Sequence, residues 1–396
     1  RSTDAEFYLD RIKLRGTETE APPVRVQLDQ SSRISGTLTG TARVEDESGK
    51  RLRELGPGMK WSVESAGDGT LTLAVRSESG TVSSNEELRI RPSSDSAFLA
   101  HDGTRYRGDF LLRQTEKGNL ALINQLPVEK YLYGVVRKEI APNWPTEVVR
   151  AQAVAARSFV VARMRGADNG EDYDVQSSHF SQVYGGYDAE DPQIRQAVDA
   201  TAGQVLTYNN RVVPAYYHAN SGGHIETAET VWNSAKTPYI TPKKDTWSVS
   251  AQHATWESTL TQSEIARSLR SSDVPNPSTP LNIRPEETLS SGRTHTISYR
   301  SPGAGRAEVN ANDFRIAVGP RTLKSTWFEN INEGSTRIEF EGRGWGHGIG
   351  LSQWGARAMA EAGQSHRQIL NFYYENAHLL DGYGLGAAHG ETIINE

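Results

Sequence analysis

The chain has 396 residues, 36% of them hydrophobic, so it can bury substantial cores and wholesale disorder is excluded. Its 43 Lys and Arg residues are outnumbered by 49 Asp and Glu residues, and this net charge of −6 argues against nucleic acid as a partner. Cysteine is absent, which excludes disulfides, thiol nucleophiles and iron–sulfur clusters. No apolar run approaches the roughly 20 residues of a membrane helix, but the chain starts at Arg1, so a removed signal peptide or N-terminal membrane anchor stays open.

Residues 24–91 have the alternation typical of β-strands. A hairpin is predicted across the turn at 66–69, because apolar and polar residues alternate on both sides of it. The polar run 91–96 is interpreted as a boundary. It divides the chain into a β-rich region, 1–96, and a second domain, 97–396.

Helical spacing follows a second predicted hairpin, whose turn is Lys117-Gly118-Asn119. The residues on one face of a short helix are Leu132, Val135, Val136 and Glu139. Pro145 is placed to begin a longer helix, which Gly166 ends. With helices grouped rather than alternating with strands, the fold class is predicted to be α+β.

A Pro- and Ser-rich stretch at 271–292 is predicted to be an exposed insertion. Two capping-box signatures predict short helices, one opened by Thr261 with Glu264 and the other by Ser365 with Gln368.

Glu139 is the first candidate for chemistry. It lies on the apolar stripe of its helix, so its carboxyl is expected to face packed side chains, where burial raises the pKa of a carboxyl group. A Glu that stays protonated near neutral pH can act as a general acid. The other interpretation is a structural ion pair with one of the nearby cations Arg137, Lys138, Arg150 or Arg157.

A glycine-rich segment at 342–350 is the second candidate. Glycine stands at every other position, so a strand there would have one bare face, open to a ligand or to another backbone. Trp345 and His347 would stand on the opposite face and suit a sugar ring. Tight packing at a bend is the alternative. The pattern does not fit a dinucleotide-binding fingerprint.

A third candidate surrounds the turn Ser221-Gly222-Gly223, which is rich in backbone donors. We interpret it as a polar substrate-binding loop, with an ordinary turn as the alternative. His218, His224 and Glu226 could also be metal ligands, but their spacing matches no zinc signature. Ser221 lacks the surroundings of a nucleophilic serine.

Gln182 and Tyr184 are predicted to share one side of an extended segment. In isolation this fourth pattern indicates little. Its value lies in its order relative to the other motifs along the chain.

Taken together, these segments resemble the SpoIID/LytB family, over roughly residues 106–380. The matching strings are Leu126–Val136, Glu139–Pro145, Ala151–Ser158, Gln182–Gly185, Ser221–Gly223, Thr230–Trp232 and Gly344–Gly355. The β-rich part before them is less diagnostic.

The resemblance implies a peptidoglycan lytic transglycosylase that acts on glycan strands stripped of stem peptides. Such enzymes cleave the MurNAc–GlcNAc bond by attack of the MurNAc 6-hydroxyl on its own anomeric carbon, which gives a 1,6-anhydro sugar. The family's catalytic Glu falls on Glu139, and one carboxyl group suffices because the nucleophile is intramolecular. The residues implied to bind substrate are Arg157, Gln182, Tyr184, His218, Ser221, Gly222, Gly223, Trp345, His347, Ser352 and Gln353.

Within this set, Arg157 is expected to orient Glu139 or to meet a lactyl carboxylate. The alternatives to the enzyme are a non-catalytic wall-binding protein that stimulates a cell-wall amidase, and a hydrolase that uses water. The resemblance also implies export to the cell envelope, with glycan strands and an amidase as partners. Some relatives bind zinc through cysteines, but this chain has none at 176–181, so no metal and no cofactor is expected.

Overall fold

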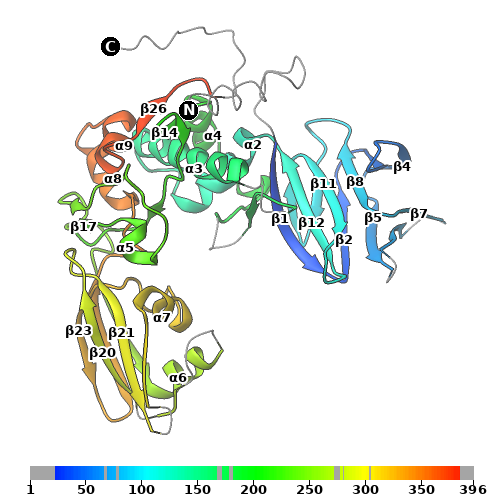
Figure 1. Ribbon diagram of the computed structural model, residues 1–396. Helices are drawn as coiled ribbons and strands as arrows, with labels where there is room; N and C mark the ends of the chain where they lie inside the picture. Colours follow the sequence, from blue (N-terminus) through cyan, green and yellow to red (C-terminus); the bar gives the residue numbers. More distant parts are fainter. Residues whose placement is uncertain are drawn as a thin grey trace, which may run out of the picture.

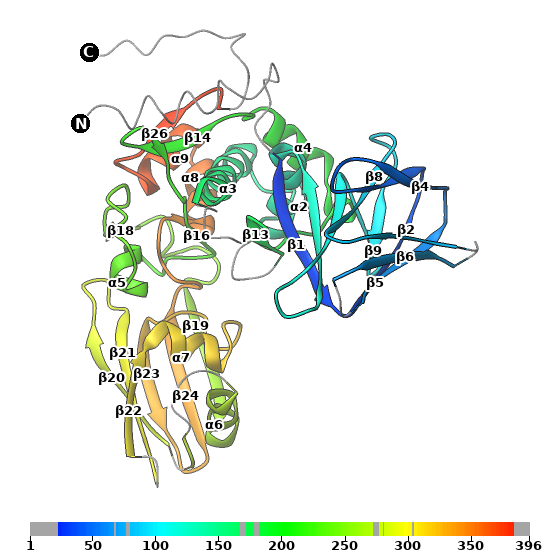
Figure 2. The same cartoon turned by 45° about the vertical axis from the view of Figure 1, so that its right-hand side comes forward.

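The computed structural model describes residues 23–66, 69–76, 80–166, 172–177, 182–271, 277–279, 281–302 and 305–383. β-rich N-terminal sheets are followed by a mixed region of helices and strands, in agreement with the predicted class (Figure 1). A second view shows the N-terminal sheets beside the central helices, and a smaller sheet-and-helix part below the helices (Figure 2). Within the described residues, no helix has the length and apolar character needed to cross a membrane.

Two antiparallel-rich sheets form the N-terminal part. In order across the first sheet, the strands are β13 (Val175–Gln176), β1 (Val24–Ser31), β12 (Leu120–Leu126), β11 (Asp109–Gln114), β8 (Glu87–Pro92), β3 (Ala42–Asp46) and β4 (Arg51–Leu55). Across the second they are β10 (Thr104–Tyr106), β9 (Leu99–His101), β2 (Arg33–Leu38), β5 (Lys60–Ser65), β6 (Leu71–Val75) and β7 (Thr81–Ser84). Both sheets contribute to one hydrophobic core, which includes Val24, Ile34 and Phe110.

Both predicted hairpins are confirmed, as β5–β6 and β11–β12. The first sheet also crosses the expected boundary at residue 96. Because β8 pairs with β11, and β12 pairs with β1, the N-terminal sheets include the chain up to Leu126.

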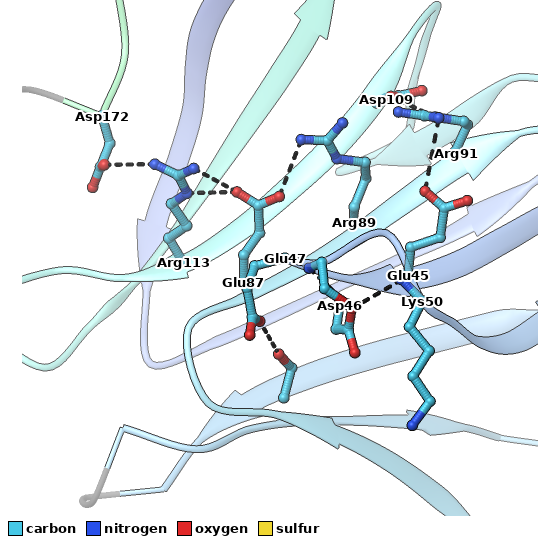
Figure 3. A network of polar contacts seen from close by, with 12 residues as sticks. Glu45, Asp46, Glu47, Lys50, Glu87, Arg89, Arg91, Asp109, Arg113 and Asp172 are labelled. Carbon is cyan, nitrogen blue, oxygen red and sulfur yellow. Dashed lines mark hydrogen bonds and ion pairs between the residues drawn. The ribbon is translucent and has the colours of Figure 1, made fainter.

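A network of charged side chains covers part of the first sheet (Figure 3). Glu87 accepts hydrogen bonds from Arg113 and Arg89, and Arg113 also pairs with Asp172 at 2.8 Å. Partly exposed pairs of this kind contribute about 1 kcal/mol or less each. Their effect here is positional, because they attach the segment before β13 to the sheet, and this segment leads toward Gln182.

The central part is built around α3. Its helices are α2 (Val128–Glu139), α3 (Thr146–Gly166), α4 (Pro192–Asp199), α5 (Ala228–Trp232), α8 (Gln353–Glu361) and α9 (His366–Tyr373), with a 3₁₀ turn η1 (Tyr187–Ala189). Its short strands are β14 (Val205–Tyr208), β15 (Arg211–Val212), β16 (Tyr217–His218), β17 (His224–Ile225), β18 (Lys243–Lys244), β25 (Leu351–Ser352) and β26 (His378–Leu380).

Helix α3 is apolar on two sides, as expected of a helix surrounded by protein. Val149 and Ala153 pack into the core shared with the N-terminal sheets, whereas Val148 and Val154 pack into a second core with α8 and α9. The predicted helix over this stretch is confirmed, and so is the shorter helix that ends at Glu139.

The third part is the segment between β19 and β24. It holds two sheets and two helices: β19 (Thr255–Thr261), β24 (Arg337–Arg343) and β23 (Phe328–Glu333); β20 (Asn282–Thr288), β21 (Thr294–Ser301) and β22 (Gly305–Asn310); α6 (Gln262–Arg270) and α7 (Ala311–Val318). Both predicted capping boxes are present, at the starts of α6 and α9. β20 lies within the expected exposed insertion at 271–292, and five of its seven residues are exposed, whereas Ile283 lies in the core of this part; residues 272–276 and 280 lie outside the described residues.

Candidate functional site

Glu139 is the last residue of α2 and its side chain is half-buried. Its Oε2 accepts a hydrogen bond of 3.4 Å from Nε2 of Gln353, the first residue of α8. Further hydrogen bonds come from the side chain of Tyr217 and from the backbone of Val183. Segments far apart in the sequence therefore meet at one carboxyl group.

Burial raises the pKa of Glu139 from 4.5 to about 7, and the hydrogen bonds from Gln353, Val183 and Tyr217 oppose this rise. Its place at the carboxyl end of a helix also disfavours the charged form. In the part of the chain that the structure describes, no cation forms an ion pair with this carboxyl group. The group therefore exchanges its proton near neutral pH, as a general acid and base requires.

The predicted structural ion pair is not formed with the expected partners. Arg150 pairs with Glu147 at 2.7 Å. Arg157, with only 1% of its side chain exposed, pairs with Glu129 at 2.7 Å.

The expectation that Arg157 orients Glu139 is also wrong. Arg157 binds both carboxylate oxygens of Glu129 and donates to the carbonyl oxygens of Val198 and Gln204. Glu129 and Glu139 are ten residues apart on α2, which places them about 15 Å apart along the helix axis. Arg157 thus holds the start of α2 and is too enclosed to meet a substrate carboxylate.

Gln182 is buried and holds the Tyr217 side chain that contacts Glu139. Its Oε1 accepts a hydrogen bond from the hydroxyl of Tyr131, and its Nε2 donates to the hydroxyl of Tyr217 at 3.0 Å. The Tyr217 hydroxyl is then oriented to donate to Glu139. Tyr184 is buried against Tyr131, with ring centroids 5.0 Å apart, so it belongs to the core that carries Gln182.

The turn at Ser221 is buried rather than open. Ser221 Oγ donates to Asp245 at 2.7 Å, and the N–H groups of Gly222 and Gly223 donate to Asn220 and to Ser221 Oγ. Its backbone donors are therefore already satisfied, which favours the alternative of a structural turn.

A buried polar cluster joins this turn to α8. Ser352, the N-cap of α8, accepts a hydrogen bond from the N–H of Ser221 at 3.2 Å and contacts Ser248 at 2.8 Å. Asp245 accepts hydrogen bonds from Ser221, Ser248 and Tyr373. Because Gln353 follows Ser352 directly, this cluster sets the position of the amide that contacts Glu139.

The glycine-rich segment is not the predicted strand. β24 ends at Arg343, and the next four alternate glycines, 344, 346, 348 and 350, all have positive φ, between 67° and 111°. A Cβ on Gly344 would lie 2.7 Å from the carbonyl oxygen of Asn220, and one on Gly350 would lie 2.2 Å from that of Tyr216. The glycines allow two backbones to pack together, so the packing alternative is correct.

His347 and His218 belong to this packing. The Nε2 of His347 donates to the carbonyl oxygen of Tyr217 at 3.0 Å, and its Nδ1 accepts from the N–H of Ile349. Burial, together with the charge of Arg315, lowers the pKa of His347 to about 3. His218 is buried and contacts the carbonyl oxygen of Ile349 through Nδ1, and burial lowers its pKa too. Both imidazoles are therefore neutral and bound to the backbone, and their contact with a sugar stays a prediction.

Trp345 is half-buried, as His347 is, and its ring contacts that of His253 with centroids 4.7 Å apart. Of the predicted set, Gln353 contacts Glu139 directly and Gln182 does so through Tyr217. Three residues of the site were not predicted from the sequence: Tyr217, Asp245 and Gln152. The Oε1 of Gln152 accepts a hydrogen bond of 3.4 Å from Gln353. Gln152 lies inside one of the matching strings, which was the available signal.

Among the described residues, no group of three or more His, Asp or Glu side chains could hold a metal ion. Within the segment 176–181, on which the zinc question fell, residues 178–181 lie outside them. Two surface hollows lie away from Glu139, one along β20–β22 and one over β2 and β5. The family resemblance also implies a cleft that binds glycan strands, and this cleft stays a prediction.

The chain is similar to known proteins of the family that the matching strings indicate. The family model for Stage II sporulation protein (SpoIID) matches residues 116–208. The chain is 30% identical to an uncharacterized protein of Brachyspira hyodysenteriae over 280 residues, which is 71% of this chain and 73% of that protein. It is 29% identical to Stage II sporulation protein D of Bacillus subtilis over 280 residues, 65% of this chain and 76% of that one.

The chain is also similar in sequence to a protein named for another role. The chain is 30% identical to the Amidase enhancer of Bacillus subtilis over 333 residues, covering 72% of this chain but 46% of that longer protein. The matching strings and these similarities agree: the chain belongs to the SpoIID family.

Proposed function

We propose that this protein is an exported peptidoglycan lytic transglycosylase that cleaves MurNAc–GlcNAc bonds in peptide-stripped glycan strands, with Glu139 as its catalytic residue. The observation that carries the proposal is the state of that carboxyl group. It is half-buried, it is surrounded by neutral hydrogen-bond donors, and its pKa is raised to about 7. The similarity to Stage II sporulation protein D and to the Amidase enhancer supports a role at the cell wall.

The reaction needs one carboxyl group in two roles. Protonated Glu139 gives its proton to the glycosidic oxygen as the bond to the MurNAc anomeric carbon breaks. The MurNAc 6-hydroxyl then forms the new bond to that carbon, and its proton returns to the Glu139 carboxylate. Water is not consumed, and the enzyme ends in its starting protonation state.

The hydrogen bonds at the carboxyl group suit this cycle. Gln353 and Tyr217 stabilise the carboxylate formed after the first transfer, while burial stabilises the protonated form that starts the reaction. A pKa near the working pH makes both transfers feasible.

The test compares the wild type with Glu139→Gln on amidase-stripped glycan strands, with the products read by mass spectrometry. The wild type is expected to release 1,6-anhydro ends and Glu139→Gln to release none. Glu116→Gln, which changes an exposed glutamate in the β11–β12 turn, is the matched control and is expected to act as the wild type. Reducing ends in place of anhydro ends would show hydrolysis and contradict the proposal.

The similarity to the Amidase enhancer favours a second candidate, a non-catalytic protein that stimulates an N-acetylmuramoyl-L-alanine amidase. The same variants separate the two functions. If wild type and Glu139→Gln both leave stripped strands intact and both raise amidase activity on intact peptidoglycan, the second function is correct.

A further inference from the structure

A row of half-buried aromatic side chains starts beside Glu139. We call Trp144, Trp354, His253 and Trp345 the aromatic row. Successive ring centroids along it lie 4.8, 5.8 and 4.7 Å apart. Trp354 directly follows Gln353 on α8, and the Gln353 side chain contacts Glu139, so the backbone that carries Trp354 also carries a residue of the proposed catalytic site.

The row is assembled from separate segments and held in place. Trp144 lies in the corner between α2 and α3, Trp354 in the first turn of α8, and Trp345 in the glycine-rich segment. His253 has a φ of 65°, a conformation that a residue other than glycine adopts at a cost of about 1 kcal/mol or more. The Asn220 side chain fixes its turn by donating to the carbonyl oxygen of Gln252 at 2.9 Å.

Positive charge lies at both ends of the row. The guanidinium of Arg357 stands 4.9 Å from the ring centroid of Trp354, and it is neutralised by Glu361 at 2.8 Å. The ammonium group of Lys324 stands 5.2 Å from the centroid of Trp345. Lys324 is half-exposed and forms no ion pair with any residue that the structure describes. The far end of the row therefore combines aromatic rings with an unneutralised cation.

Resting on the proposed function, we infer that the aromatic row binds the glycan strand and that Lys324 recognises the free lactyl carboxylate of a MurNAc residue. Aromatic rings offer apolar surface to the faces of sugar rings. A stem peptide converts the lactyl carboxylate into a neutral amide, so a cation at this place favours strands from which peptides have been removed. Lys324 is thus a specificity-determining residue, and the row gives the substrate its direction away from Glu139.

The experiment measures binding by calorimetry, with Glu139→Gln as the background so that no strand is cleaved. Three ligands of equal length are compared: stripped glycan strands, the same strands with their carboxylates amidated, and chitin oligosaccharides, which lack the lactyl group. Trp345→Ala is expected to weaken all three by about tenfold. Lys324→Gln is expected to weaken only the stripped strands, by about fivefold, to the level of the amidated ones.

Lys117→Gln, at an exposed lysine in the β11–β12 turn, is the matched control and is expected to bind all three ligands as the background protein does. If Lys324→Gln weakens chitin as much as stripped strands, or weakens neither, the carboxylate assignment is overturned. Unchanged binding by both Trp345→Ala and the milder Trp345→Phe would overturn the role of the row. Because cleavage is not measured, these outcomes are independent of whether Glu139 produces anhydro ends.

Discussion

Replacing Glu139 by Gln should make the protein more stable at high pH, because the native structure holds a carboxyl group that resists ionisation. Its pKa rises from 4.5 to about 7 on folding. Between these values the folded state binds more protons than the unfolded state, so the free energy of unfolding of the wild type falls as pH rises from about 4.5 to about 7. Above pH 7 the full difference is about 3 kcal/mol.

Glu139→Gln lacks this ionisation. Its free energy of unfolding relative to the wild type should therefore increase by about 3 kcal/mol between pH 4 and pH 8. Urea unfolding of both proteins at both pH values measures the change, and any effect of the amide itself cancels in the difference. Glu116→Gln shows what removal of an exposed carboxyl group does.

Direct titration gives a second measurement. In protein with ¹³C-labelled glutamate, the carboxyl resonance that Glu139→Gln lacks should titrate with a midpoint near 7. A midpoint near 4.5, or equal changes in stability at pH 4 and pH 8, would refute the reasoning and remove the main support for the proposed general acid.

Three further substitutions test the surroundings. Tyr217→Phe removes a hydrogen bond that lowers the pKa of Glu139, so the pH at which activity on stripped strands is half-maximal should move upward; a downward shift would contradict the assignment. Gly348→Ala should lower the melting temperature more than Gly363→Ala, since both glycines have positive φ but only at 348 would a Cβ meet a buried guanidinium, at 2.4 Å; equal losses would show that backbone strain alone matters. Arg157→Met should cost about 3–5 kcal/mol of unfolding free energy by breaking its enclosed ion pair, while the activity of the folded fraction keeps its pH dependence; a shifted pH profile would restore a role for Arg157 at the site.

The sequence predicted α2, α3, α6 and α9, and the position of Glu139 on α2, because helical spacing and capping boxes depend on local geometry. The spacing of Leu132, Val135 and Val136 is enough to turn Glu139 toward packed side chains, and the capping box at Thr261 depends on residues three apart. Features of this kind require no knowledge of distant segments.

The glycine-rich segment was beyond such reasoning. Alternate glycines are compatible both with an extended strand and with a segment whose glycines have positive φ. The second conformation is set by close packing against the backbone at 216–221, which is distant in the sequence. Arg157 was misplaced for a similar reason, since its partner Glu129 lies 28 residues away and no local pattern selects it over other acids. The partners of Glu139 were found in part, through strings shared with a family, whereas Tyr217 required the fold.

The pairing of Thr255 with Arg343 brings the two ends of the third part of the chain side by side. A module whose entrance and exit are neighbours can be exchanged for a shorter or different one without moving the scaffold that carries it. The exchange would not be silent, however, because Arg293 extends from the β20–β21 loop to the backbone of Ser221, where it donates a hydrogen bond of 2.5 Å. A module with a different β20–β21 loop would therefore change the support of the Ser221 turn, even though the rest of the central part stayed the same.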